Sequence, residues 1–180
     1  MARHRLGFKH SAQEIKLEGT GTKLSEWQSG TDKSKIDADA LERAVSEWFD
    51  SGDVSCDIGL GDSPTRTTLA EVPADWQALV PLSAYMEVGG TVASGETVSI
   101  SIKAILDDGT EIEMATYSVT GGTGSSTVGA DTIMANLMDN ARSAGVSLDG
   151  KRITSVVADV KTSATSTSAT AKARVQGVKT

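Results

Sequence analysis

The sequence predicts a mainly β fold of the α+β class: an antiparallel β-sandwich or barrel with two short helices and an extended N-terminal arm. Three observations predict it. Apolar and polar residues alternate along residues 97–105 and again along residues 111–119, and the same alternation returns near the C-terminal end. Hydrophobic residues make up 38 % of the chain but aromatic residues only 4 %, so Val, Ile, Leu, Ala and Met must form the core. The 180 residues are enough for one domain with an extension.

The segment 97–119 predicts a β-hairpin. Its first strand places four apolar residues on one face, Val98, Ile100, Ile102 and Ala104. Residues 107–110 (Asp-Asp-Gly-Thr) supply a turn with glycine where a positive φ is needed. The second strand continues the apolar face with Ile112 and Met114. We therefore expect one side of the hairpin to be buried and the other to be solvated or covered by a partner.

Two more strands are expected at the C-terminal end. Residues 151–160 are rich in Val and Ile, and residues 169–178 alternate Ala and Val with charged and polar residues. The Ser/Thr-rich run 162–168 between them is typical of a solvated loop or a polar strand tip. Residues 53–80 predict an irregular connection that ends in one strand through residues 79–86, and the glycine-rich residues 121–126 predict a flexible loop.

Helices are predicted near 36–50 and 131–143. The first has apolar residues at helical spacing that include Trp48 and Phe49, which we expect to face the core, and Gly52 stands where a C-terminal cap belongs. The inner face expected for the second helix comprises Ile133, Met134, Leu137, Met138 and Ala141. Asp131 is its candidate N-cap, and Gly145 its candidate stop.

Domain organisation follows from these elements and from the charges. Residues 1–35 form the predicted arm, and residues 36–180 a single β-rich domain. The arm carries seven Lys/Arg and four Asp/Glu, whereas residues 36–150 carry four Lys/Arg and nineteen Asp/Glu. Residues 151–180 carry six Lys/Arg and one Asp. Two basic ends therefore flank an acidic middle.

This charge asymmetry has three interpretations. The basic ends fold back onto the acidic body of their own chain, or they reach an acidic surface on a neighbouring subunit, or they bind nucleic acid. We expect no direct nucleic-acid binding, because the acidic body repels phosphate and few aromatic residues lie among the basic ones.

Catalytic and metal chemistry find little support. The histidines, His4 and His10, both lie in the predicted arm, and Cys56 is a lone cysteine, so neither a nucleophile–base pair nor a zinc site is expected. An acidic group around the 107–110 turn, Asp107, Asp108, Glu111 and Glu113, lacks the spacing of a calcium loop. Residues 59–63 (Gly-Leu-Gly-Asp-Ser) lack the closing Gly-Lys-Ser/Thr of a phosphate loop. We expect no enzyme, no cofactor and no metal.

The basic polar arm, the alternating hairpin at 97–119 and the Gly/Ser/Thr-rich loops near 121–129 and 162–170 together resemble virion proteins of tailed viruses, of the capsid decoration (cement) or tail-tube type. The resemblance implies a β core that packs against neighbours while an arm extends over the next subunit. It implies homo-oligomeric assembly and carries over no individual residue.

The function expected first is therefore a capsid decoration protein in a virion assembled in the host cytoplasm. Its partners would be other copies of itself and another structural protein such as a major capsid protein, with no membrane. Arm residues Arg3, Arg5, Phe8 and Lys9 are the candidate subunit contacts. One alternative is a tail-tube subunit. The other is a carbohydrate- or ligand-binding β-sandwich, whose candidate aromatic platforms are Trp27, Trp76 and Tyr85.

Overall fold

Nine strands and one helix follow Ser46 in the computed structural model, which describes residues 47–73 and 76–180. The elements in chain order are β1 (Glu47–Asp50), β2 (Val54–Cys56), β3 (Thr65–Glu71), β4 (Leu79–Thr91), β5 (Thr97–Leu106), β6 (Glu111–Thr120), β7 (Gly124–Gly129), α4 (Ala130–Ala144), β8 (Ile153–Thr162) and β9 (Ser168–Lys179). The predicted arm, and the part of the first predicted helix before residue 47, lie outside the described residues.

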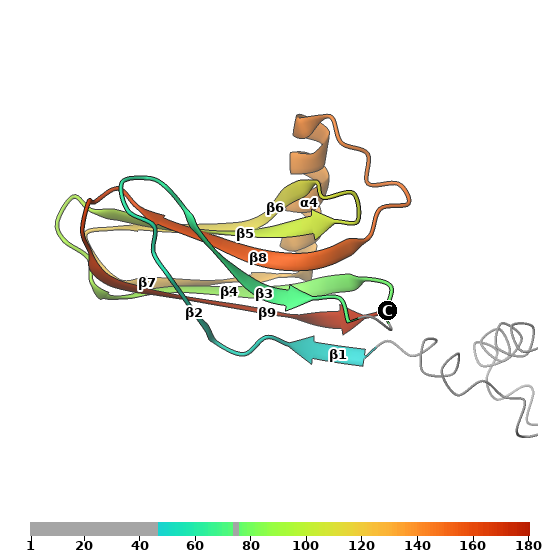
Figure 1. Ribbon diagram of the computed structural model, residues 1–180, viewed down its shortest axis with the longest axis horizontal. Helices are drawn as coiled ribbons and strands as arrows, with labels where there is room; N and C mark the ends of the chain where they lie inside the picture. The colour runs from blue at the N-terminus through green and yellow to red at the C-terminus, as the bar shows by residue number, and fades with distance from the viewer. Residues whose placement is uncertain (1–46, 74–75) are drawn as a thin grey trace, which may run out of the picture. The chain divides into compact units, whose positions relative to one another are not determined.

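The strands form two antiparallel layers (Figure 1). One layer runs β7–β4–β9, with β1 and β2 one after the other along the far edge of β9. The other runs β6–β5–β8–β3. A single pair, Leu79 with Ile153, joins the layers through β4 and β8. Figure 1 shows α4 standing across one end of the strands, where it packs against β6 and β4.

The core between the layers confirms the predicted hairpin and fold class. Val98, Ile100, Ile102 and Ala104 have no exposed surface, and neither has Met114 on β6. Ile102 lies opposite Ala158 of β8, with Ala104 opposite Val156, so the apolar faces of the two strands coincide. Gly109 adopts the expected positive φ of 83° in the turn. Period-2 patterning therefore predicted which face of these strands is buried.

The first predicted helix is wrong over residues 47–50. These residues form β1, which pairs with β9 so that Trp48 lies opposite Val178. Trp48 is 55 % exposed, not part of the core. Gly52 does have a positive φ of 66°, but it follows a strand and caps no helix. Pairing with a strand over 120 residues away has overridden a local helical pattern.

Two predicted irregular regions also contain strands. Residues 53–80 hold β2 and β3 besides the start of β4, and the predicted flexible loop at 121–126 runs into β7. The strand predicted through residues 79–86 is confirmed and extends to Thr91 as β4.

The second predicted helix is confirmed as α4, with two corrections. Its N-cap is Gly129 without a side-chain cap, so Asp131 lies in the first turn instead. The buried face consists of Ile133, Leu137 and Ala141, whereas Met134 and Met138 are 48 % and 53 % exposed. A helix at the end of a sandwich contacts it with a narrow stripe, which is why the predicted inner face was too wide. Gly145 ends the helix in the left-handed conformation, as expected.

Candidate functional site

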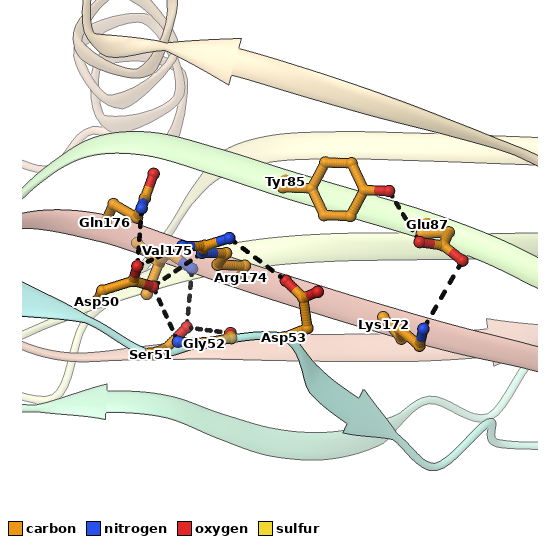
Figure 2. A network of polar contacts seen from close by, with 10 residues as sticks. All are labelled: Asp50, Ser51, Gly52, Asp53, Tyr85, Glu87, Lys172, Arg174, Val175 and Gln176. Carbon is orange, nitrogen blue, oxygen red and sulfur yellow. Dashed lines mark hydrogen bonds and ion pairs between the residues drawn. The ribbon is translucent and has the colours of Figure 1, made fainter.

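The outer face of the β7–β4–β9 layer carries a network of polar side chains from three strands (Figure 2). In β9, Ala171, Ala173 and Val175 are buried, so the alternating residues Lys172, Arg174 and Gln176 point outward. Their partners come from β4, from the end of β1 and from the β1–β2 connection. We call this set the outer polar face: Asp50, Asp53, Tyr85, Glu87, Lys172, Arg174 and Gln176.

Asp50 is the centre of the first half of this face. Arg174 donates from Nε to Asp50 Oδ1 at 2.8 Å and from its terminal nitrogen to Oδ2, and Gln176 Nε2 donates to Oδ2 at 2.8 Å. The backbone N–H of Gly52 donates to Oδ1 at 2.9 Å. Arg174, Gly52 and Gln176 together hold the pKa of Asp50 well below its usual range. This carboxylate is already satisfied as a hydrogen-bond acceptor, which leaves it little capacity to act as a base.

The second half joins β4 to β9. Tyr85 Oη donates to Glu87 Oε2 at 2.8 Å, and Lys172 Nζ lies 4.0 Å from Glu87 Oε1. The carboxylate of Glu87 raises the pKa of Tyr85 because it accepts the phenolic proton as a hydrogen bond. Tyr85 is half-buried, so part of its ring remains accessible beside these charges.

The opposite layer carries a matching network on its own outer side. Arg66 on β3 donates from Nε to Asp159 Oδ1 at 2.7 Å and forms a two-pronged pair with Glu111 at 2.6 and 2.8 Å. Lys103 Nζ lies 2.7 Å from Asp159 Oδ2. Arg66 first and Lys103 second lower the pKa of Asp159. One ionic cluster therefore ties the four strands β3, β8, β5 and β6 together.

The basic C-terminal end pairs with the acidic body of its own chain. All six Lys/Arg residues from 151 to 180 lie within 4.0 Å of a carboxylate from residues 47–150. These pairs are Lys151–Asp108, Arg152–Asp107, Lys161–Asp62, Lys172–Glu87, Arg174–Asp50 and Lys179–Glu47. For this end of the chain, these pairs are those that the first of the three interpretations of the charge asymmetry predicts.

The candidate residues from the sequence are distributed unevenly. Arg3, Arg5, Phe8 and Lys9 lie outside the described residues, as does Trp27. Tyr85 lies on the outer polar face. The ring of half-buried Trp76 has Lys179 Nζ 5.3 Å from its centre, so a cation occupies one side of this platform.

The remaining candidates form no reactive centre. Cys56 is buried, and burial raises the pKa of its thiol, which disfavours the thiolate. Asp107 and Asp108 each bind a cation of the C-terminal end, while Glu113 accepts a hydrogen bond from Ser101 at 2.6 Å. Over residues 47–73 and 76–180, no three His, Cys, Asp or Glu side chains gather as a metal site would require.

Sequence reasoning missed Asp50 and Asp53 as site residues. Asp50 was assigned to a helix, and Asp53 to an irregular connection. The signal that could have identified them is the outward series Lys172, Arg174 and Gln176 on β9, which requires acceptors on the neighbouring strand.

No protein-family model and no curated protein matches the sequence. Three solved structures of infectious bursal disease virus show a partial likeness at 15 % identity. For the Gx strain the match covers 74 % of this chain and 32 % of that chain, with a TM-score of 0.37. For the VP2 subviral particle the values are 73 %, 32 % and 0.31, and for the Gt strain 76 %, 30 % and 0.25. This chain thus spans about a third of the length of those chains, and likeness at these TM-scores carries no functional argument.

Proposed function

We propose that the chain is a non-enzymatic structural subunit of a virus particle, of the capsid decoration (cement) type. One observation supports this most: every cation of the folded body is paired within the same chain. Each Lys and Arg side chain in the described parts of the chain, including Arg66, Lys103 and Arg142, lies within 4.0 Å of one of its own carboxylates.

Catalysis requires polar groups that are held in place but still available to a substrate. On both outer faces of the sandwich the carboxylates at the centre of each cluster, Asp50 and Asp159, are engaged by cations of the same chain. Their lowered pKa values make them poor bases at neutral pH. This arrangement supports a structural role over an enzymatic one.

Charge also bears on the partner. With its cations paired and its acids in excess, the described body offers phosphate groups little attraction. Protein partners fit better: other copies of the chain and a second structural protein such as a major capsid protein. We propose the virion as the location, with assembly in the host cytoplasm. None of the described helices has the length and hydropathy needed to cross a bilayer.

The arm supplies the proposed subunit contacts. Residues 1–35 carry a net positive charge, and we propose that Arg3, Arg5 and Lys9 pair with acidic side chains of a neighbouring subunit while Phe8 adds apolar contact. Arms that order on a neighbour contribute affinity through many small contacts. A tail-tube subunit is the variant of this proposal within the same class of protein.

A second candidate function rests on Tyr85. A half-exposed aromatic ring on the outer side of the sheet, beside Glu87 and near Arg174, is an arrangement that could hold a sugar ring and its hydroxyl groups. Titration of the full chain with soluble oligosaccharides tests it. Saturable binding that Tyr85→Ala abolishes would support the carbohydrate-binding function and count against the structural one.

The structural proposal is tested by immuno-electron microscopy of particles from the virus that carries this sequence. Antibody against the folded body should label intact particles. Label over the shell supports decoration, and label confined to a tail supports the tail-tube variant. Particles without label, in preparations where the free protein is detected, would overturn the proposal.

A further inference from the structure

The edge strand β7 has an unpaired side and lacks the residues that normally prevent an edge from pairing with another strand. We propose that β7 of one copy pairs with β7 of a second copy around a two-fold axis, so that the β7–β4–β9 layers of two copies form one continuous sheet. The inference rests on the proposed function as an assembly subunit and names its first partner, a second copy of the chain.

Among the described residues, β7 hydrogen-bonds to β4 along one side, and its other side has no strand partner. The pairing with β4 runs from Gly124 to Gly129 without a bulge. Folded monomers normally protect such edges with charged residues, proline or bulges. The β7 sequence, Gly-Ser-Ser-Thr-Val-Gly, has none of these.

The other edges of the sandwich differ from β7 in this respect. The β3 edge carries Arg66 and Glu71, and β6 begins with Glu111 and Glu113 separated by one residue. The β1 strand carries Glu47 and Asp50. Charges of this kind discourage edge-to-edge pairing, and β7 carries none over its whole length.

The absence of charged residues from β7 matters for self-association because the whole chain is acidic. The net charge is −7, and the described body is acidic, so two copies repel each other over most of their surface. A two-fold axis places every residue of an interface opposite a residue of the same interface. Like charges directly opposite each other destabilise an antiparallel pair, and a strand without charges avoids this. Self-pairing is therefore least costly at β7.

The side chains suit a sheet that continues across the axis. Ser125 and Thr127 are exposed on the same side as Tyr85 and Glu87, and Ser126 and Val128 are half-buried toward the core. Two paired β7 strands would join the outer polar faces of two copies into one surface. Because α4 begins at Ala130 and packs on β6 and β4, the pairing would end at the helix.

Sedimentation equilibrium of the full chain over a range of concentrations tests the proposal. The wild type should form a concentration-dependent dimer. A Ser125→Lys/Thr127→Lys variant places like charges on the proposed pairing and should weaken dimerisation by roughly tenfold or more. The matched control is Thr116→Lys/Ser118→Lys, which adds the same two exposed lysines to the edge strand of the other layer and should leave the dimer unchanged.

A second measurement does not depend on how well the lysine variant folds. With the two-fold axis at Thr127, this residue lies opposite its counterpart, so Thr127→Cys should yield a covalent dimer on mild oxidation, while Ser118→Cys should not. A wild type that stays monomeric, or a dimer equally sensitive to both lysine variants, would overturn the β7 pairing. If the protein is monomeric and antibody against it nevertheless labels intact particles, the inference fails while the proposed function stands. If the dimer forms as described but particles carry no label, the proposed function fails and the pairing stands.

Discussion

Thr162 on β8 donates a hydrogen bond of 2.9 Å to the carboxylate of Glu96, 66 residues earlier in the chain, and both side chains are buried. The hydroxyl of Thr167 and the backbone N–H of Ala93 donate to the same carboxylate. Glu96 therefore fastens the β4–β5 connection to the β8–β9 connection at one end of the sandwich. These donors, with Thr167 first, lower the pKa of Glu96.

The Glu96 contacts predict a pH dependence of stability. Because its pKa is lower in the folded state, the carboxylate stabilises the fold fully above about pH 4.3, its unfolded pKa, and this contribution is lost as the pH falls below that value. Glu96→Gln should lower the melting temperature at pH 7, and the difference from wild type should shrink toward pH 3. Melting curves across this range check it, with exposed Glu71→Gln as the control. A difference that is constant with pH would contradict the assignment.

Ile102 predicts the cost of a core cavity. Its side chain has no exposed surface and lies between Ala158 and Ala115 on the flanking strands. Ile102→Ala should reduce the free energy of unfolding by about 2–5 kcal/mol in denaturant titrations. Ser99→Ala, on the outward side of the same strand, should change it by less than about 0.5 kcal/mol. Equal effects of the two variants would mean that the strand faces are reversed.

The burial and ion pairs of Asp159 predict how much the ionic cluster contributes to the stability of the fold. Its side chain is only 7 % exposed and contacts both Arg66 and Lys103. Asp159→Ala should destabilise the fold by about 1–3 kcal/mol, since both cations can still turn toward water. The surface pair of Arg142 with Asp139 supplies the control, because Arg142→Ala should cost less than about 0.5 kcal/mol. Thermal unfolding in 0.1 M salt compares them, and an Asp159 effect as small as the control would argue against the cluster.

Close packing at Gly177, where β1, β9 and β4 meet, leaves no room for a side chain. A Cβ atom at this position would lie 2.1 Å from the backbone oxygen of Val80 and 2.9 Å from Phe49 Cε1. Gly177→Ala should therefore destabilise the protein by at least about 1–3 kcal/mol. At Gly122 a Cβ atom meets nothing within 4 Å, so Gly122→Ala should be neutral or slightly stabilising. Similar melting temperatures for both variants would contradict the close packing at Gly177.

Much of the fold was predictable because its signal is local. The alternation through Val98, Ile100 and Ile102 needs no knowledge of the partner strand, and the spacing of Ile133, Leu137 and Ala141 likewise identifies α4. The Ser/Thr-rich run predicts a solvated loop or a polar strand tip. Thr162 does end β8, but it is fully buried because Glu96 accepts a hydrogen bond from its hydroxyl. A long-range hydrogen bond of this kind leaves no mark on the local pattern.

Other strands depend on partners distant in sequence. Trp48 and Phe49 have helical spacing relative to the residues before them, but pairing with β9 places them in a strand. Strand β7 has no alternation of apolar and polar residues, since Val128 is its one large apolar residue, and pairing with β4 sets its register. The outer polar face was missed for the same reason: Asp50 and Arg174 come together only when β1 meets β9. Tertiary pairing decides such segments, not propensity.

Co-sedimentation with purified particles tests the central claim most directly. The claim is that the cations of the folded body are paired within the chain and that the arm makes the contacts with the particle. Wild-type protein and the Arg3→Glu/Arg5→Glu/Lys9→Glu variant are compared at about 0.1 M salt, where exposed charges are screened over about 10 Å. We predict that the wild type pellets with the particles and that the variant stays largely in the supernatant with an unchanged melting temperature. Equal pelleting of both proteins, with a lowered melting temperature for the variant, would contradict the account, because the arm would then act on its own chain.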